Sequence, residues 1–126
     1  MTANVECIDT DSSVYDAIER MVDKRIRSLI IGPPDINSGV ITARDVVFKV
    51  LARGISPKDT KASEIASKPV VCIDKNAGLI EAATKMEESN VARIFVSDGK
   101  KLVGVLSMID VMESSLILRA RGTHAV

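Results

Sequence analysis

The sequence predicts an α+β fold made of two pseudo-symmetric halves, each with the order strand, helix, strand, strand, helix. The seven residues 39–45 recur as residues 104–110, and both copies read glycine, two apolar residues, a hydroxyl residue, two others and aspartate. The same offset aligns residues 5–9 with 70–74, and no insertion or deletion interrupts it from Val5 to Val47. Two copies of a long period indicate an internal pair rather than a solenoid.

The bulk composition is that of a globular protein. At 126 residues one compact domain is expected, and because each half alone would bury little surface, the halves are expected to share one core. The 17 basic and 17 acidic residues balance, so the chain has no net positive charge that would attract nucleic acid or an acidic membrane. No apolar run could span a membrane and no signal peptide precedes the first strand, which predicts a cytoplasmic protein.

Each half begins with a short strand, residues 5–8 and 70–73, followed by an amphipathic helix. Ser13 with Asp16 three residues later is a helix-capping pattern. Apolar residues then recur at the spacing of one helix face. The first stripe consists of Val14, Ala17, Ile18, Met21 and Val22, and its copy of Leu79, Ala82, Ala83 and Met86.

Hairpins and second helices complete the halves. Residues 29–31 and 94–96 are rich in strand formers, and each run is followed by a turn and a returning strand. A helix after each repeated stretch is expected to end at Gly54 and near Gly122. Its inward residues are predicted to be Val46, Val47, Val50 and Leu51, and in the second copy Val111, Met112, Leu116 and Ile117. The polar linker between the halves contains a possible short helix around residues 62–66.

The repeated stretch offers chemistry for a ligand. A strand ends at Thr42 or Ser107 and a helix begins there, whose free N–H groups and dipole attract phosphate. Asp45 and Asp110, one turn later, can each accept two hydrogen bonds from a vicinal diol such as ribose. The glycine before each strand permits close approach of a ligand or of another part of the chain.

The same residues also have a purely structural interpretation. Thr42 with Asp45, and Ser107 with Asp110, are capping-box-like pairs with aspartate in place of glutamate. A duplicated structure duplicates its caps, so two copies do not decide between capping and ligand binding. The two roles can also coexist.

Taken together, these features resemble a tandem pair of CBS domains, also called a Bateman module, from Val5 to about Leu118. The resemblance is carried by the element order, the two Gly-h-h-Thr/Ser-x-x-Asp stretches and the sequence Ser67-Lys68-Pro69 before the next strand. It implies CBS motifs at 1–54 and 69–121, packed through their sheets, a linker at 55–68 and a polar tail at 122–126. It further implies a non-catalytic regulatory module without a cofactor, which binds AMP, ADP, ATP or another adenosyl ligand. A homodimer and an unidentified regulated protein are the expected partners.

The resemblance also implies roles for individual residues. The hydroxyls of Thr42 and Ser107 would contact phosphate or ribose, the carboxylates of Asp45 and Asp110 would bind ribose, and Arg44 would meet phosphate. Further contacts are expected from Arg27 and Arg93 to phosphate, and from the first strands to adenine through Cys7, Ile8, Val71, Cys72 and Ile73. The sequence departs from the family pattern at two places. Ile109 replaces the second arginine of the Thr-x-Arg-Asp pattern. The first repeat also lacks the short leading segment before its first strand, which the linker provides to the second repeat.

Two other classes of function remain. The chain could be an interaction module with vestigial clefts that serves as a dimerisation platform, in which case the aspartates are caps. An enzyme is least favoured, because no nucleophile–base pair, metal-ligand spacing or P-loop is present. Cys7 and Cys72 are expected to pack as thiols, and His124 lies in the polar tail. Few aromatic residues are available to stack on nucleic acid.

Overall fold

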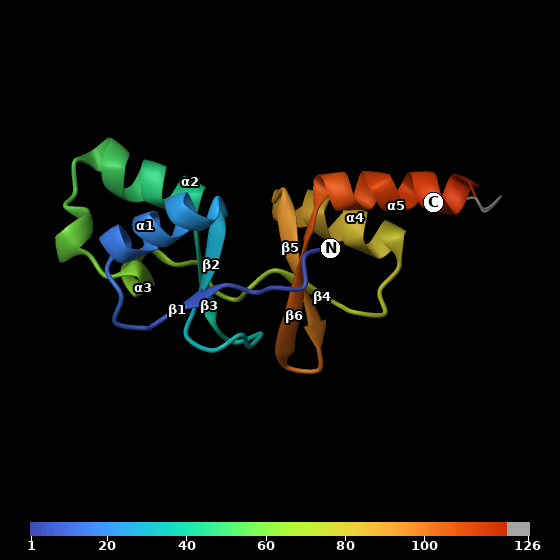
Figure 1. Cartoon of the computed structure of the whole chain (residues 1–126), viewed down its shortest axis with the longest axis horizontal. Coiled ribbons are helices and arrows are strands. Elements are labelled where there is room, and N and C mark those ends of the chain that lie inside the picture. Colours follow the sequence, from blue (N-terminus) through green and yellow to red (C-terminus); the bar gives the residue numbers. More distant parts are fainter. Residues whose placement is uncertain (121–126) are drawn as a thin grey trace. The chain divides into compact units, whose positions relative to one another are not determined.

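The computed structural model describes residues 1–120, with side chains up to residue 116. Two compact units are present (Figure 1): the first unit is Val5–Val70, and the second unit is the chain from Val71 onward together with Met1–Asn4. Each unit contains one three-stranded mixed sheet with its helices. The predicted α+β class and the repeated element order are therefore confirmed. None of the helices in the described part is long and apolar enough to cross a membrane.

In the first unit the sheet has the order β1-β2-β3. Strand β1 runs parallel to β2, whereas β2 and β3 form the predicted hairpin, with Ser28 opposite Thr42. The elements are β1 (Cys7–Ile8), α1 (Val14–Lys24), β2 (Ser28–Ile31), β3 (Gly39–Thr42), α2 (Ala43–Asp45), the π-helical turn η1 (Val46–Val50), the 3-10 turns η2 (Leu51–Arg53) and η3 (Pro57–Asp59), and α3 (Ala62–Ile65).

In the second unit the order is β4-β5-β6, again with a parallel pair followed by a hairpin. Gly99 forms the hairpin turn with a φ of 64°, a conformation that glycine adopts without strain. The elements are β4 (Cys72–Asp74), α4 (Leu79–Ser89), β5 (Arg93–Asp98), β6 (Lys101–Ser107) and α5 (Met108–Ala120).

Helix α1 begins where the sequence predicts. The Asp16 N–H donates to Ser13 Oγ over 3.0 Å, and the Ser13 N–H donates to Asp16 Oδ2 over 3.1 Å. Of the predicted stripe, Val22 is 69% exposed, which corrects the expectation that it faces inward. Ala83 in α4 is likewise exposed. The other stripe residues are buried or half-buried: Val14, Ala17, Ile18, Met21, Leu79, Ala82 and Met86.

The second helix of each half also departs from the prediction. Val46 and Val50 are buried, but Val47 and Leu51 are 46% and 50% exposed. The buried pair is four residues apart, as on one face of a helix, and the residues that follow each of them lie beside that face and are exposed. Gly54 ends the helix as predicted, with a φ of 66°.

In α5 only Val111 among the predicted residues packs partly against the core. Met112 and Leu116 are 59% and 66% exposed, so their predicted burial is wrong. They lie on a face of α5 that its own sheet does not cover. The side chain of Ile117, Gly122 and the tail at 122–126 lie outside the described residues.

Each unit has a cluster of buried residues between its sheet and helices. In the first unit Leu29 and Ile41 face α1 and the second helix, and both are fully buried. In the second unit Ile94 is the fully buried centre. Around these lie Ile8, Val14, Ala17, Met21, Val46 and Val50 in the first cluster, and Ile73, Ala82 and Met86 in the second.

A short leading segment pairs with the edge of each hairpin. Ser67 exchanges two backbone hydrogen bonds of 2.9 and 3.0 Å with Val40, and Thr2 does the same with Val105 over 3.0 and 2.9 Å. The expectation that the first repeat lacks a leading segment is therefore wrong: residues 1–4 suffice for one, and they pair with β6. A Cβ on Gly104 would lie 3.0 Å from the Thr2 carbonyl oxygen, so glycine is needed here for the approach of the chain itself.

Candidate ligand site at the repeated motifs

The residues of the first motif meet where β2 and β3 end and α2 begins. Thr42 is the last residue of β3 and lies opposite Ser28, and the Ala43 N–H donates to the Arg27 carbonyl over 2.9 Å. This pairing brings Arg27, Thr42, Arg44 and Asp45 to one end of the sheet. In the second motif Arg93 lies opposite Ser107, at the position that Ser28 has in the first motif, and Asp110 lies in the first turn of α5.

Both motif aspartates cap the helix that they begin. Asp45 Oδ2 accepts the Thr42 N–H over 3.0 Å, and Thr42 Oγ1 accepts the Asp45 N–H over 3.0 Å. Asp110 Oδ2 accepts the Ser107 N–H over 2.8 Å, and Ser107 Oγ accepts the Asp110 N–H over 3.2 Å. The capping interpretation is thus confirmed, and it uses only one oxygen of each carboxylate.

The second oxygen of each carboxylate faces a cation. Asp45, only 9% exposed, has its Oδ1 3.0 Å from Lys49 Nζ. Asp110 Oδ1 lies 3.2 Å from the Met1 ammonium nitrogen. Lys49 is not among the site residues predicted from the sequence, although an aspartate four residues before a lysine is a known pairing on helices. Each motif therefore has one oxygen that caps the helix and one that takes a positively charged donor.

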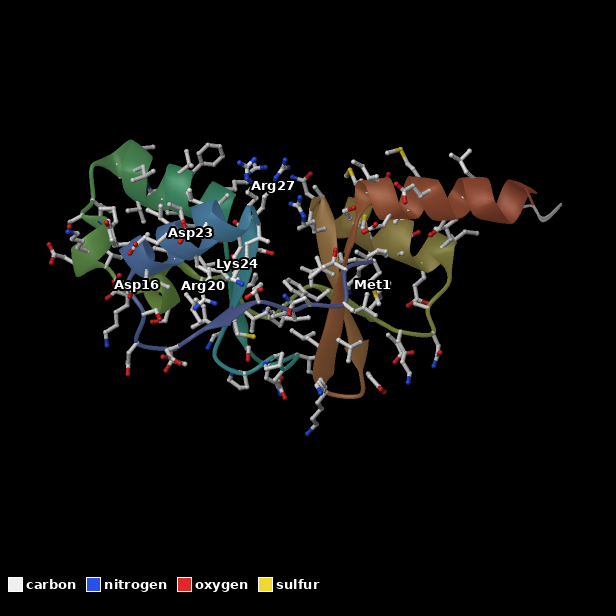
Figure 2. All side chains as sticks on the ribbon, viewed as in Figure 1. Met1, Asp16, Arg20, Asp23, Lys24 and Arg27 are labelled. Carbon is white, nitrogen blue, oxygen red and sulfur yellow. The ribbon has the colours of Figure 1, made fainter. Side chains whose placement is uncertain are left out.

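The arginines differ in their surroundings. The Arg44 guanidinium carbon lies 5.3 Å from the centre of the Phe48 ring, which is a cation–π arrangement on an exposed surface. Arg27 is exposed. Figure 2 shows it beyond the C-terminal end of α1, whereas Asp16 lies near the N-terminal end. Ile109, at the position that Arg44 occupies in the first motif, is 62% exposed. The first motif consequently carries more positive charge than the second.

The first-strand residues lie apart from the motif of their own unit. Because β2 stands between β1 and β3, Cys7 and Ile8 are at the opposite edge of the sheet from Thr42. The carbonyls of Glu6 and Ile8 accept hydrogen bonds from β2 and the residue after it, so the backbone of Cys7 faces the outer edge. Val71, Cys72 and Ile73 have the same relation to β5 in the second unit. Burial, together with the charge of Glu6, raises the pKa of the Cys7 thiol, which keeps it protonated.

A cavity of about 460 Å³ lies between β1 and α1 in the first unit. Figure 2 shows Asp16, Arg20 and Asp23 projecting from α1 on this part of the unit. Four carboxylates surround the cavity against one guanidinium, and Arg20 already pairs with Glu6 over 3.6 Å. Such a lining repels phosphate, so the phosphate end of an anionic ligand fits the motif end of the sheet better. The cavity is lined by Cys7, Ile8, Asp9, Ser12, Asp16, Glu19, Arg20, Asp23 and Gly32.

The comparison with protein families agrees with this repeated architecture. The profile of the CBS domain matches residues 1–52 and 62–116. The chain belongs to the CBS domain family. It is a tandem pair, as the sequence predicted, and family members commonly bind adenosyl ligands.

Similar CBS proteins come from several different organisms. Hypoxic response protein 1 of Mycobacterium tuberculosis is 34% identical over 112 residues, covering 88% of this chain and 78% of the relative. A hexameric CBS-CP12 protein from bloom-forming cyanobacteria has a TM-score of 0.83 at 33% identity, over 94% of this chain and 70% of that one. A candidate signal-transduction protein with CBS domains from Burkholderia ambifaria has a TM-score of 0.81 at 29% identity, over 92% and 85%. This CBS pair is accordingly a regulatory or signal-transduction module, of a kind that is usually non-catalytic.

The second CBS motif allows a test by pH. The Ser107 N–H lowers the pKa of Asp110 most; partial burial opposes this, and the Ser107 hydroxyl and the Met1 ammonium lower it further. Ionised Asp110 therefore stabilises the folded chain above the unfolded pKa of about 3.9, and this contribution is lost as the pH falls through the lower folded value. We expect Asp110→Asn to melt below the wild type at pH 6 and the difference to shrink toward pH 3. A difference that stays constant over this range would contradict the assignment.

Proposed function

We propose that this CBS pair is a non-catalytic regulatory module that binds an adenine nucleotide or another adenosyl compound at its repeated motifs. The observation that carries the proposal is that each motif places a hydroxyl and a carboxylate oxygen not used for capping at the end of the sheet where the neighbouring strand begins, with an arginine just before that strand (Arg27) or as its first residue (Arg93). These three groups match a ribose diol next to a phosphate. Their joint appearance at both motifs goes beyond what helix capping requires.

Each group has a definite role in this proposal. Asp45 Oδ1 and Asp110 Oδ1 would accept hydrogen bonds from ribose hydroxyls, which are good donors to a carboxylate. Arg27 and Arg44 would bind phosphate, because guanidinium offers paired donors in a plane. Backbone groups of Cys7, Ile8, Val71, Cys72 and Ile73 would contact adenine, although these residues lie at the other edge of each sheet from the motif of their own unit. Ser107, Thr42 and Arg93 would complete the sites. The first motif should prefer the more phosphorylated ligand, because Ile109 offers no charge in the second.

Regulation would follow if the ligand bound two conformations of the protein with unequal affinity. A ligand changes the population of two conformations only by the difference between its affinities for them. A partner protein would then respond to the favoured conformation. The mechanism requires no reaction of the ligand.

A ligand panel tests the proposal. We expect one or more of AMP, ADP, ATP, NAD and S-adenosylmethionine to raise the melting temperature. A ligand at a hundred times its dissociation constant stabilises by about 2.7 kcal/mol, which corresponds to roughly 5–15 °C for a chain of this size. A flat panel would reject adenosyl sensing and favour an interaction module with vestigial clefts.

Amide variants of the motif carboxylates separate binding from capping. Asp45→Asn and Asp110→Asn should abolish the ligand-induced rise, because the amide loses the charge that strengthens the ribose hydrogen bonds. The matched control is Asp98→Asn, which removes an exposed carboxylate paired with Lys75 outside the motifs. If the motif variants melt lower but respond to ligand like the control, the aspartates are caps only.

We further propose that two copies pair through the exposed apolar faces of their helices. Large apolar side chains are exposed on the helices of each unit, and exposed apolar surface that forms a large patch marks an interface. The cyanobacterial relative is hexameric, which supports self-association in this family. The residues are Tyr15, Val22, Val47, Phe48 and Leu51 in the first unit, and Ile80, Met108, Ile109, Met112 and Leu116 in the second.

A further inference from the structure

Lys49 connects the first motif to the segment that follows it. Its Nζ lies 3.0 Å from Asp45 Oδ1 and donates to the Ile65 carbonyl oxygen over 3.1 Å. Asp45 is buried, whereas the Lys49 side chain is 41% exposed. A hydrogen bond to a buried carboxylate is stronger than an exposed ion pair. Lys49 therefore joins two parts of the chain, because its ammonium contacts both Asp45 and Ile65, which are 20 residues apart.

The second contact of Lys49 is at the end of α3. Ile65 is the last residue of this helix, whose final carbonyls have no partner within the helix. A lysine there satisfies a carbonyl and complements the negative end of the helix dipole. On either side, the Ala62 N–H donates to the Ser12 carbonyl and Ser67 pairs with Val40. The Lys49 contact completes the attachment of this segment to the first unit.

The acceptor that Lys49 occupies is the oxygen that a ribose would need. Asp45 Oδ2 is engaged by the Thr42 N–H, so Oδ1 is the oxygen open to an additional donor. A ribose hydroxyl and the Lys49 ammonium would then compete for the same side of a carboxylate that is largely enclosed by protein.

We propose that Lys49 is a built-in competitor for the ligand and transmits occupancy of the first motif to α3. When a diol takes Asp45 Oδ1, Lys49 leaves, the Ile65 carbonyl loses its donor, and the end of α3 loosens. The inference rests on the proposed function and adds a route by which binding changes the protein. The repeat places Ser114 at the position equivalent to Lys49, so the link from the motif to α3 belongs to the first motif, whereas in the second motif the Met1 ammonium occupies Asp110 Oδ1.

Hydrogen exchange without ligand tests whether Lys49 holds the end of α3 in place. Lys49→Met keeps most of the side-chain length but removes the charge, and we expect the amides of residues 65–67 to exchange several-fold faster. Lys49→Arg should keep the wild-type rate, and the matched control Lys100→Met changes an exposed lysine in the β5–β6 turn. Equal exchange in Lys49→Met and wild type would overturn the proposal whether or not a ligand binds.

Adenosine, which has the diol but no phosphate, tests the competition. We expect Lys49→Met to bind adenosine about three- to tenfold more tightly, as loss of one competing hydrogen bond implies. Adenosine should speed exchange of residues 65–67 in the wild type but not in Lys49→Met. Weaker binding by Lys49→Met would make Lys49 a ligand contact and overturn the competition. If the wild type binds no adenosyl compound, the proposed function and the competition both fail. Hydrogen exchange without ligand still tests whether Lys49 holds residues 65–67 to the first motif.

Discussion

Leu29→Ala is expected to lower the free energy of unfolding by about 2–5 kcal/mol. Leu29 is fully buried in β2, where it lies opposite Ile41 and faces α1. Removing its side chain leaves a cavity, because closely packed neighbours relax only in part. Since domains are stable by about 5–15 kcal/mol, the variant would lose a large fraction of its stability. Urea unfolding followed by circular dichroism measures the change.

The internal repeat supplies a matched experiment. Ile94 in β5 occupies the position equivalent to Leu29 and is also fully buried. Ile94→Ala should cost a similar amount, whereas the milder Ile94→Val should cost about 0.5–1.5 kcal/mol. A loss below about 1 kcal/mol for both alanine variants would show that these positions are not closely packed.

Met112→Glu is expected to dissociate the dimer that we propose. Ile109, Met112 and Leu116 are spaced to share one face of α5, and each is more than half exposed. An unpaired carboxylate in the centre of an apolar interface costs several kcal/mol, which weakens association by at least tenfold. Light scattering coupled to size-exclusion chromatography would report the change in mass.

The control for this variant is on the same helix. Glu113→Gln alters an exposed residue next to Met112 and should leave the mass unchanged. Because Met112 is exposed within the chain, Met112→Glu should keep the wild-type circular dichroism spectrum. A wild type that is monomeric at micromolar concentration, or a variant with the wild-type mass, would contradict the proposed interface.

Much of the fold could be predicted because its signals are local. Ser13 and Asp16 marked the start of α1, Gly54 marked the end of the second helix, and the turn at Gly99 joined a hairpin. The repeated motifs identified Thr42 and Asp45 with their copies. In each case the residues that cause the feature lie within a few positions of it.

Burial of the helices was harder to predict. Leu51 and Met112 are apolar at helical spacing, yet both are exposed. Periodicity places apolar residues on a face, but it does not say whether the chain's own core or another surface covers that face. The π-helical turn after Asp45 was not predicted either, because apolar spacing alone does not distinguish such a turn from an α-helix.

The sequence by itself determined the repeated α+β architecture, the family and the residues of both motifs, because these depend on short patterns and on one constant offset. Only the tertiary structure decided how the motif carboxylates are used. It brought Lys49 and the Ile65 carbonyl to Asp45, and it paired Thr2 with Val105 beside Gly104. These contacts join residues far apart in the chain, and they form only when the packing of whole strands and helices has brought those residues together.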